Sequence, residues 1–427
     1  MTPLQIKKLE RDLEKYVEYL TTGMGRPERR EAMGKYVSGL LLDGKRKCIV
    51  PMAVRLAADA SDVQAQRQRL QRCVKSSWLD EVLYQRIALK LERELPGIEA
   101  FVVDDTGFAK KGTRSPGVAR QYSGTLGRTD NCQVAVSLHL AGEKGSGCVG
   151  MQLYLPKVWT SDRERCRQAK IPDGIGYAPK WQIALDLIDN ALGWGVQPPV
   201  TLADSGYGDT TEFRAGLGER GLIYNVAVKG TTVVWPPGAT FEIPQKRSGR
   251  GRRPSKLRST GSKPVSIAAL AKDMGRSAYR KVTWRQGTRG KMSSSFVCLR
   301  VRSAHGHDKG HPPGEEQWLL CEWPKDKDAP TKFYLSTQPA SCSLKQLVRT
   351  AHLRWRVERD YQDLKQEVGL DQFEGRTWPG FHHHTALCAA AHAFLALRRA
   401  LFPPEHNTVD LAAGATPSAA SAACKAR

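Results

Sequence analysis

Hydrophobic residues in the first 95 positions recur every three or four residues, which is the spacing of one face of an α-helix. The pattern occurs in five segments, at 4–20, 27–42, 51–56, 63–74 and 80–95. The second segment opens with Pro27, which suits the first turn of a helix because its missing N–H has no partner there. Residues 1–95 are therefore predicted to form a compact bundle of helices.

After residue 95 the pattern changes to apolar runs that are typical of strands, at 99–104, 131–140 and 147–155. A helical pattern follows at 180–192, and further strand-like runs occur at 200–203 and 222–228. Strands that alternate with helices indicate an α/β fold with a mixed sheet flanked by helices. The run at 222–228 is expected to complete that sheet.

Residues 229–335 have a different character. Short β-rich runs at 281–284, 295–301 and 317–323 are separated by glycine and proline turns, which predicts a β-rich insertion into the α/β unit. Residues 246–256 are rich in Lys and Arg and poor in apolar residues. They are predicted to form a generic phosphate-binding loop.

The segment 353–367 predicts a helix with two distinct faces. At about 100° per residue, Arg354, Glu358 and Lys365 share an arc of roughly 40°, and the apolar residues form a neighbouring stripe that faces the core. A carboxylate flanked by two cations suits metal-assisted work on phosphate. The alternative for such a helix is a solvated charged face.

Further acids follow apolar strands upstream of that helix. Asp104 and Asp105 end the first strand-like run and Asp204 follows the one at 200–203, each just before a glycine turn. Acids at the carboxyl ends of strands lie where open α/β sheets place their ligand sites. Together with Glu358 they suit two Mg²⁺ ions about 4 Å apart, an arrangement that cleaves phosphodiesters. The alternative for any single Asp is a helix cap or a turn former.

The composition favours a nucleic-acid partner and excludes a membrane span. The chain has 66 Lys and Arg against 43 Asp and Glu, and a net charge of +23 suits binding to a polyanion. The sequence contains no run of 18 apolar residues, and its polar start lacks the core of a secretion signal. A cytoplasmic, bacterial protein is expected. The ten cysteines form no Cys-x-x-Cys pair, which argues against a zinc site and fits reduced thiols.

In combination, the stretches 103–112, 203–208 and 354–376 resemble bacterial insertion-sequence transposases of the DDE class. The resemblance implies an RNase H-like core, interrupted by the β-rich insertion and preceded by an N-terminal helical domain. One branch of the class hairpins its DNA ends and carries a Tyr three residues before the Arg of this helix. Ala351 stands in that place here, so a hairpin step stays an open question.

The resemblance also implies roles for individual residues. Asp105, Asp204 and Glu358 would hold two Mg²⁺ ions, with Mn²⁺ as a substitute, and carry the catalysis. Asp105 is preferred to Asp104 because a Thr follows this Asp in the related transposases, as Thr106 does here. The residues expected to contact DNA are Arg354, Lys365, Lys110, Lys111, Trp284, Arg285 and Arg289. For Trp284 the alternative is a buried structural tryptophan.

The implied function is a transposase that binds the ends of its element as double-stranded DNA, cuts them and joins them to target DNA. Synapsis would need at least two copies of the chain. The alternatives are a domesticated DNA-binding regulator that does not cut and a stand-alone DNA endonuclease. The expected units are 1–95 for end recognition, 96–228 and 336–402 for the catalytic core, 229–335 for the insertion and 403–427 as a disordered tail.

Two aromatic features carry simpler expectations. Trp159, in a basic loop, is expected to pack as a lid on the core. His382, His383 and His384 cannot all face one metal, because neighbours on a helix diverge by about 100°. They are expected at a helix entry near DNA.

Overall fold

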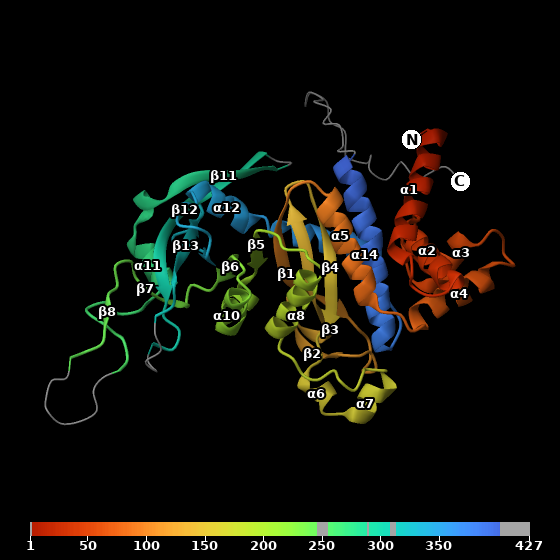
Figure 1. Cartoon of the computed structure of the whole chain (residues 1–427), viewed down its shortest axis with the longest axis horizontal. Coiled ribbons are helices and arrows are strands. Elements are labelled where there is room, and N and C mark those ends of the chain that lie inside the picture. The colour runs from red at the N-terminus through yellow and green to blue at the C-terminus, as the bar shows by residue number, and fades with distance from the viewer. Residues whose placement is uncertain (1, 246–254, 288–289, 308–312, 402–427) are drawn as a thin grey trace.

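The computed structural model describes residues 2–245, 255–287, 290–307 and 313–401, and Figure 1 shows their arrangement. The fold is a mixed α/β structure in which helices flank one large sheet, as the sequence predicted. The basic loop at 246–256 falls largely outside the described residues, and so do Arg289 and the predicted tail. Among the described helices, none is long and apolar enough to cross a membrane.

The N-terminal helices pack around the long helix α14 (Trp378–Leu401), which lies beside them in Figure 1. They are α1 (Pro3–Thr21), α2 (Pro27–Leu41), α3 (Ile49–Leu56), α4 (Val63–Lys75) and α5 (Asp80–Glu94). Each predicted helix is confirmed with ends within two residues of those expected. The Tyr16 hydroxyl donates to the Ala390 carbonyl over 2.8 Å, and both residues lie in the main hydrophobic core. These helices therefore share one core with the sheet.

The half of the sheet nearer the N-terminal helices is built around β1 (Ile98–Ala109), as Figure 1 shows. β1 pairs antiparallel with β3 (Arg128–Gly142) and parallel with β5 (Val200–Ala203), with Val103 opposite Ala203. The other strands here are β2 (Ala119–Ser123), β4 (Gly145–Leu153) and β6 (Tyr224–Val228). The helices around them are α6 (Lys157–Thr160), α7 (Arg163–Gln168), α8 (Lys180–Gly193), α9 (Ser205–Gly208) and α10 (Thr211–Glu219).

The two faces of β1 meet different partners. Ala100 and Val102 pack in one apolar cluster with Val357 of helix α13 (Trp355–Gln366) and with Leu353, which lies just before that helix. The alternate residues of the strand, such as Val103, join the main core instead. Because successive side chains of a strand point to opposite faces, the parity of a residue on β1 decides whether it faces α13.

The predicted β-rich insertion extends this sheet without a break. Strand β14 (Lys332–Ser336) pairs with β6 on one side and β13 (Glu316–Trp323) on the other, so twelve strands form one sheet. The remaining strands of this sheet are β7 (Val233–Trp235), β10 (Val265–Ser266), β11 (Arg280–Gly287) and β12 (Gly290–Ser303). Strands β8 (Phe241–Glu242) and β9 (Arg258–Ser259) form a separate two-stranded sheet. The helices of this part are α11 (Ile267–Asp273), the 3₁₀ turn Arg276–Ala278 and α12 (Leu344–His352).

Candidate active site

Asp104 lies on the face of β1 that α13 covers, because it has the same parity as Ala100 and Val102. Its carboxylate accepts a hydrogen bond of 2.7 Å from the Arg354 guanidinium. Arg354 also donates to Glu358 over 3.1 Å, one turn further along α13. The structure therefore brings Asp104, Arg354 and Glu358 together.

Asp204 completes the acidic group around Arg354. It follows β5 directly, and the register of β5 with β1 sets it beside Asp104. Its Oδ1 accepts from the backbone N–H groups of Gly206 and Tyr207, so Asp204 also acts as the helix cap that its position at a strand end suggested. Although burial opposes it, Asp104, Asp204 and Glu358 raise the pKa of Arg354.

Asp105 points away from this group. It has the parity of Val103, and its carboxylate forms an ion pair of 2.9 Å with Lys180 at the start of α8. The structure thus places the residue that the sequence favoured as a metal ligand on the opposite face of β1 from Glu358. Asp104, the alternative, occupies the face that Glu358 shares.

Burial disfavours the negative charge of Asp104 within the acidic group. The pKa of Asp104 is raised to about 6, chiefly by burial; Arg354 opposes this rise and the nearby Asp204 adds to it. The Tyr207 hydroxyl is buried beside these acids and has no hydrogen-bond partner among the described residues. Glu358 is the most accessible member, with 64% of its side chain exposed. A cation or a polar ligand would therefore be stabilised here.

The donor chemistry of this group fits a divalent cation, although the residues do not form a closed site. Within the described part of the chain, no three His, Cys, Asp or Glu side chains are placed to hold one metal ion. Arg354 lies among the three carboxylates instead and partly neutralises them. Carboxylate oxygens are the ligands that Mg²⁺ prefers, so a metal ion would have to take the place of this guanidinium.

A buried polar network fixes α13 behind the acids. His139 of β3 lies 2.7 Å from Asp360, whose other oxygen accepts from the Ser146 hydroxyl over 2.6 Å. His139 also lies 3.0 Å from Ser137, which in turn lies 2.6 Å from the Tyr361 hydroxyl. Both Asp360 and Tyr361 follow Glu358 closely, so these bonds hold the helix in register with β3.

The residues expected to contact DNA lie in several places. Lys365 donates to the Gly107 carbonyl over 3.0 Å, and Lys110 donates to the Phe373 carbonyl over 2.8 Å. The Arg285 guanidinium lies 3.8 Å from the ring centre of Trp355. Lys111 is exposed in the turn after β1. Lys365 thus lies closer to the end of β1 than to the acids.

The aromatic predictions have mixed outcomes. Trp284 packs against Phe296 and His352, with ring centres 5.6 and 4.0 Å apart, which supports its structural alternative. The Trp159 ring is fully buried and its N–H donates to a backbone carbonyl, so the expected core lid is confirmed.

The prediction for the three histidines is wrong. His382, His383 and His384 are all buried in α14, with at most 6% of any of them exposed. The His383 ring stacks on Trp78 with ring centres 3.9 Å apart and lies within hydrogen-bond distance of two backbone carbonyls. His382 accepts a hydrogen bond from the Leu153 N–H of β4, and the His384 ring lies 3.0 Å from the Tyr36 hydroxyl, so all three rings pack within the core.

Sequence reasoning missed Lys180 and the His139 network. Lys180 opens a helix far along the chain from Asp105, and His139 is a single histidine within an apolar strand. Nothing in the local pattern marks either residue. The one available signal was the alternation of side chains along β1, which shows that Asp104 and Asp105 point to opposite faces of the sheet.

Comparison with known proteins identifies the family. The family model described as DDE superfamily endonuclease matches residues 19–291, well over half of the chain. A probable transposase for insertion sequence element IS701 from Microchaete diplosiphon is 37% identical over 134 residues. That alignment covers 31% of this chain and 32% of the relative, so it spans about a third of the relative's length.

The family match extends over β1 and β5, the strands that carry Asp104 and Asp204. Glu358 lies beyond its end, and the geometry alone places that residue with the two aspartates. The chain belongs to the DDE superfamily of endonucleases.

Proposed function

We propose that this protein is a DNA transposase that cuts the ends of its element and joins them to target DNA. The observation that carries the proposal is the group of Asp104, Asp204 and Glu358 around Arg354. Asp104 lies within β1, which continues beyond the expected end of that strand, Asp204 follows β5, and Glu358 lies on α13. These three carboxylates supply the hard oxygen donors that a metal-dependent nuclease needs. The transposase name of the partly aligned relative supports the same function.

Asp104, Asp204 and Glu358 are the proposed ligands of Mg²⁺, two ions by the resemblance, with Mn²⁺ as a substitute. The bound ions supply an activated water and stabilise the leaving oxygen of the phosphodiester. Asp104 is proposed as a ligand instead of Asp105, because Asp105 is paired with Lys180 on the other face of β1. Asp105 is then a residue that positions β1 against α8.

Arg354 has two proposed roles. Without metal it neutralises the carboxylates, and with metal its guanidinium is released to the phosphate next to the scissile bond, which a planar fork binds well. Lys365 and Lys110 lie near the end of β1. They are proposed to contact phosphates further from the cut. A complex of at least two copies is proposed for the step that brings both ends together.

The proposal is tested with purified full-length protein, DNA that carries the element's own ends, and a target plasmid. Wild type is expected to cut and join the ends with Mg²⁺ and to do neither with EDTA. Glu358→Gln, Asp104→Asn and Asp204→Asn should each abolish both steps. Asp105→Asn is the matched control, because it removes the neighbouring carboxylate without touching the group around Arg354, and it should still cut.

The outcomes separate the alternatives. Loss of cutting in Asp105→Asn together with activity in Asp104→Asn would overturn the choice of ligands. Cutting without joining would indicate an endonuclease that acts alone, and binding of the ends without any cutting would indicate a regulator.

A further inference from the structure

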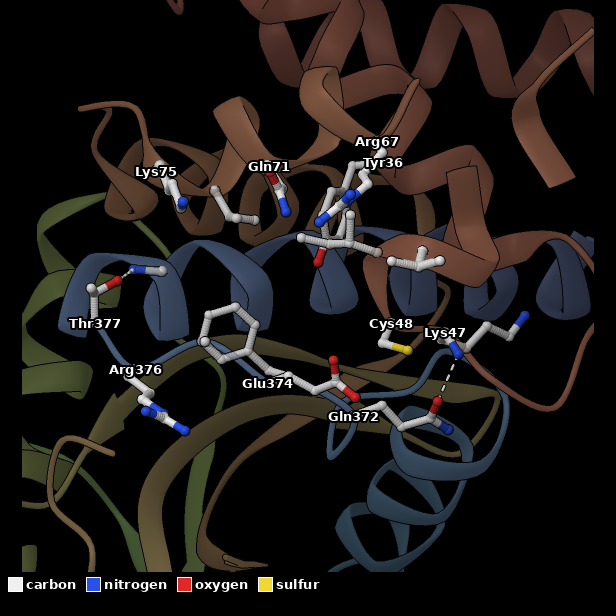
Figure 2. Close-up of a pocket in the computed structure, with 16 residues that line it drawn as sticks. Tyr36, Lys47, Cys48, Arg67, Gln71, Lys75, Gln372, Glu374, Arg376 and Thr377 are labelled. Carbon is white, nitrogen blue, oxygen red and sulfur yellow. Dashed lines mark hydrogen bonds between the residues drawn. The ribbon is translucent and has the colours of Figure 1, made fainter. Parts of the chain in front are cut away.

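A groove runs between the N-terminal helices and the loop that follows α13. It consists of two adjoining cavities of about 310 and 540 Å³, which share the lining residues Cys48, Gln372, Phe373, Glu374 and Arg376. Figure 2 shows the first cavity, with Arg67, Gln71 and Lys75 on one side and residues 372–377 on the other. The second continues to the end of β1, where Lys110 and Lys111 line it.

The charge of the groove is strongly positive. Its cations come from three separate parts of the chain, and they include Lys45, Arg46, Arg67, Lys75, Lys111 and Arg376. These six side chains belong to exposed residues. Two carboxylates, those of Asp371 and Glu374, offset only part of this charge. An anionic ligand with several charges spread along the groove would match this surface.

The groove begins at the end of β1, beyond the acidic group of the proposed active site. Lys365, on the charged row of α13, donates to Gly107. Ala109, two residues further along β1, lines the groove. Ala109 is the fifth residue after Asp104, which corresponds to about 17 Å of strand. A duplex rises about 3.4 Å per base pair, so that distance spans about five base pairs.

We propose that this groove binds the sugar–phosphate backbone of duplex DNA, about five base pairs from the scissile bond. The proposal rests on the proposed function, because it takes the duplex to be held at Asp104. The groove contacts position the DNA and carry no sequence information by themselves, since phosphates are the same at every base pair.

The test uses the Glu358→Gln protein without divalent metal, so that binding is measured and nothing is cut. Fluorescence anisotropy of a labelled duplex is recorded over a range of salt concentrations. Lys111→Gln with Arg376→Gln removes two groove cations. Lys272→Gln with Lys325→Gln is the matched control, because these exposed residues lie in the β-rich part and the net charge changes equally.

The slope of log K against log salt should fall by about 1.8 in the groove variant, since each phosphate contact contributes about 0.9. The control should keep the wild-type slope. Replacing the phosphates about five base pairs from the cut with neutral methylphosphonates should weaken wild type and leave the groove variant unchanged. Circular dichroism establishes that both variants are folded.

Equal slopes in the groove and control variants would overturn the proposal. The proposal would also be overturned if the groove variant changed the slope of log K against log salt for single-stranded DNA and not for duplex DNA. If wild type cuts its ends while the groove variant keeps its full slope, the groove assignment fails and the proposed function stands. If wild type neither binds nor cuts the duplex, both fail together.

Discussion

The buried pair of His139 and Asp360 makes the sharpest prediction for stability. Both side chains are almost fully buried, and their nearest atoms are 2.7 Å apart. Burial alone would lower the pKa of His139, but the neighbouring Cys148 and Asp360 raise it to about 10. The carboxylate of Asp360 is held in its charged form by His139 and Ser146, and its pKa is lowered in spite of burial.

The cost of breaking this pair follows from the burial of both partners. Asp360 accounts for only part of the rise in the pKa of His139, because Cys148 raises it as well. Removing one partner of a buried ion pair costs about 3–5 kcal/mol, because the other charge stays buried without compensation. We therefore expect Asp360→Asn to lower the free energy of unfolding by about 4 kcal/mol. At about 2.1 cal/mol/K per residue over this chain, Tm should fall by about 4 °C.

The measurement is thermal unfolding by circular dichroism of wild type, Asp360→Asn, His139→Gln and the double variant. The double variant should lose less than the sum of the single losses, because the second change removes a charge that the first left unpaired. Asp130→Asn is the control, since its partner Arg128 is 73% exposed and such pairs contribute less than about 1 kcal/mol. A loss in Asp360→Asn no larger than in the control would refute the reasoning.

Three further predictions concern separate parts of the molecule. Trp159→Ala should cost about 3–5 kcal/mol, because the ring is fully buried and its N–H bond to the Val118 carbonyl is lost; an unchanged Tm would contradict this. Burial lowers the pKa of His384 to about 4. The unfolded chain binds the proton more readily, so stability should fall by up to about 3 kcal/mol as pH drops from 6.5 to 4. His384→Gln should show a smaller fall in Tm over that range, and an equal fall would count against the assignment. Arg354→Gln should bind Mn²⁺ several-fold more tightly in electron paramagnetic resonance titrations, because the guanidinium no longer competes for the carboxylates; weaker binding would show that Arg354 does not oppose the metal.

The helices were the most predictable part of the fold. The N-terminal helices bury one face, and burial of one face leaves a period of three to four residues in the sequence. Strand β14 was not predicted, and its pairing with β6 and β13 is set by the tertiary fold. The continuity of the sheet across the insertion therefore could not be read from the chain.

The choice between Asp104 and Asp105 shows where sequence reasoning stops at the site. Alternation in a strand establishes that the two side chains point to opposite faces. It does not tell which face α13 covers, since that depends on contacts such as Val102 with Val357. The histidines of α14 were misjudged for a similar reason, because the helices that bury them come from the other end of the chain.

The charged row of α13 is used in two different ways, and this connects the active site with the groove. Arg354 and Glu358 face the aspartates, whereas Lys365 contacts the backbone at the end of β1. At the other end of the helix, Arg285 from the β-rich part and Arg356 lie 3.8 and 4.4 Å from the Trp355 ring centre. Arg285 of the insertion thus lies at one end of α13, and the groove lined by the N-terminal helices lies beyond its other end. A duplex held at the acids would meet both Arg285 and the groove cations, so these side chains are expected to contribute separately to its salt dependence.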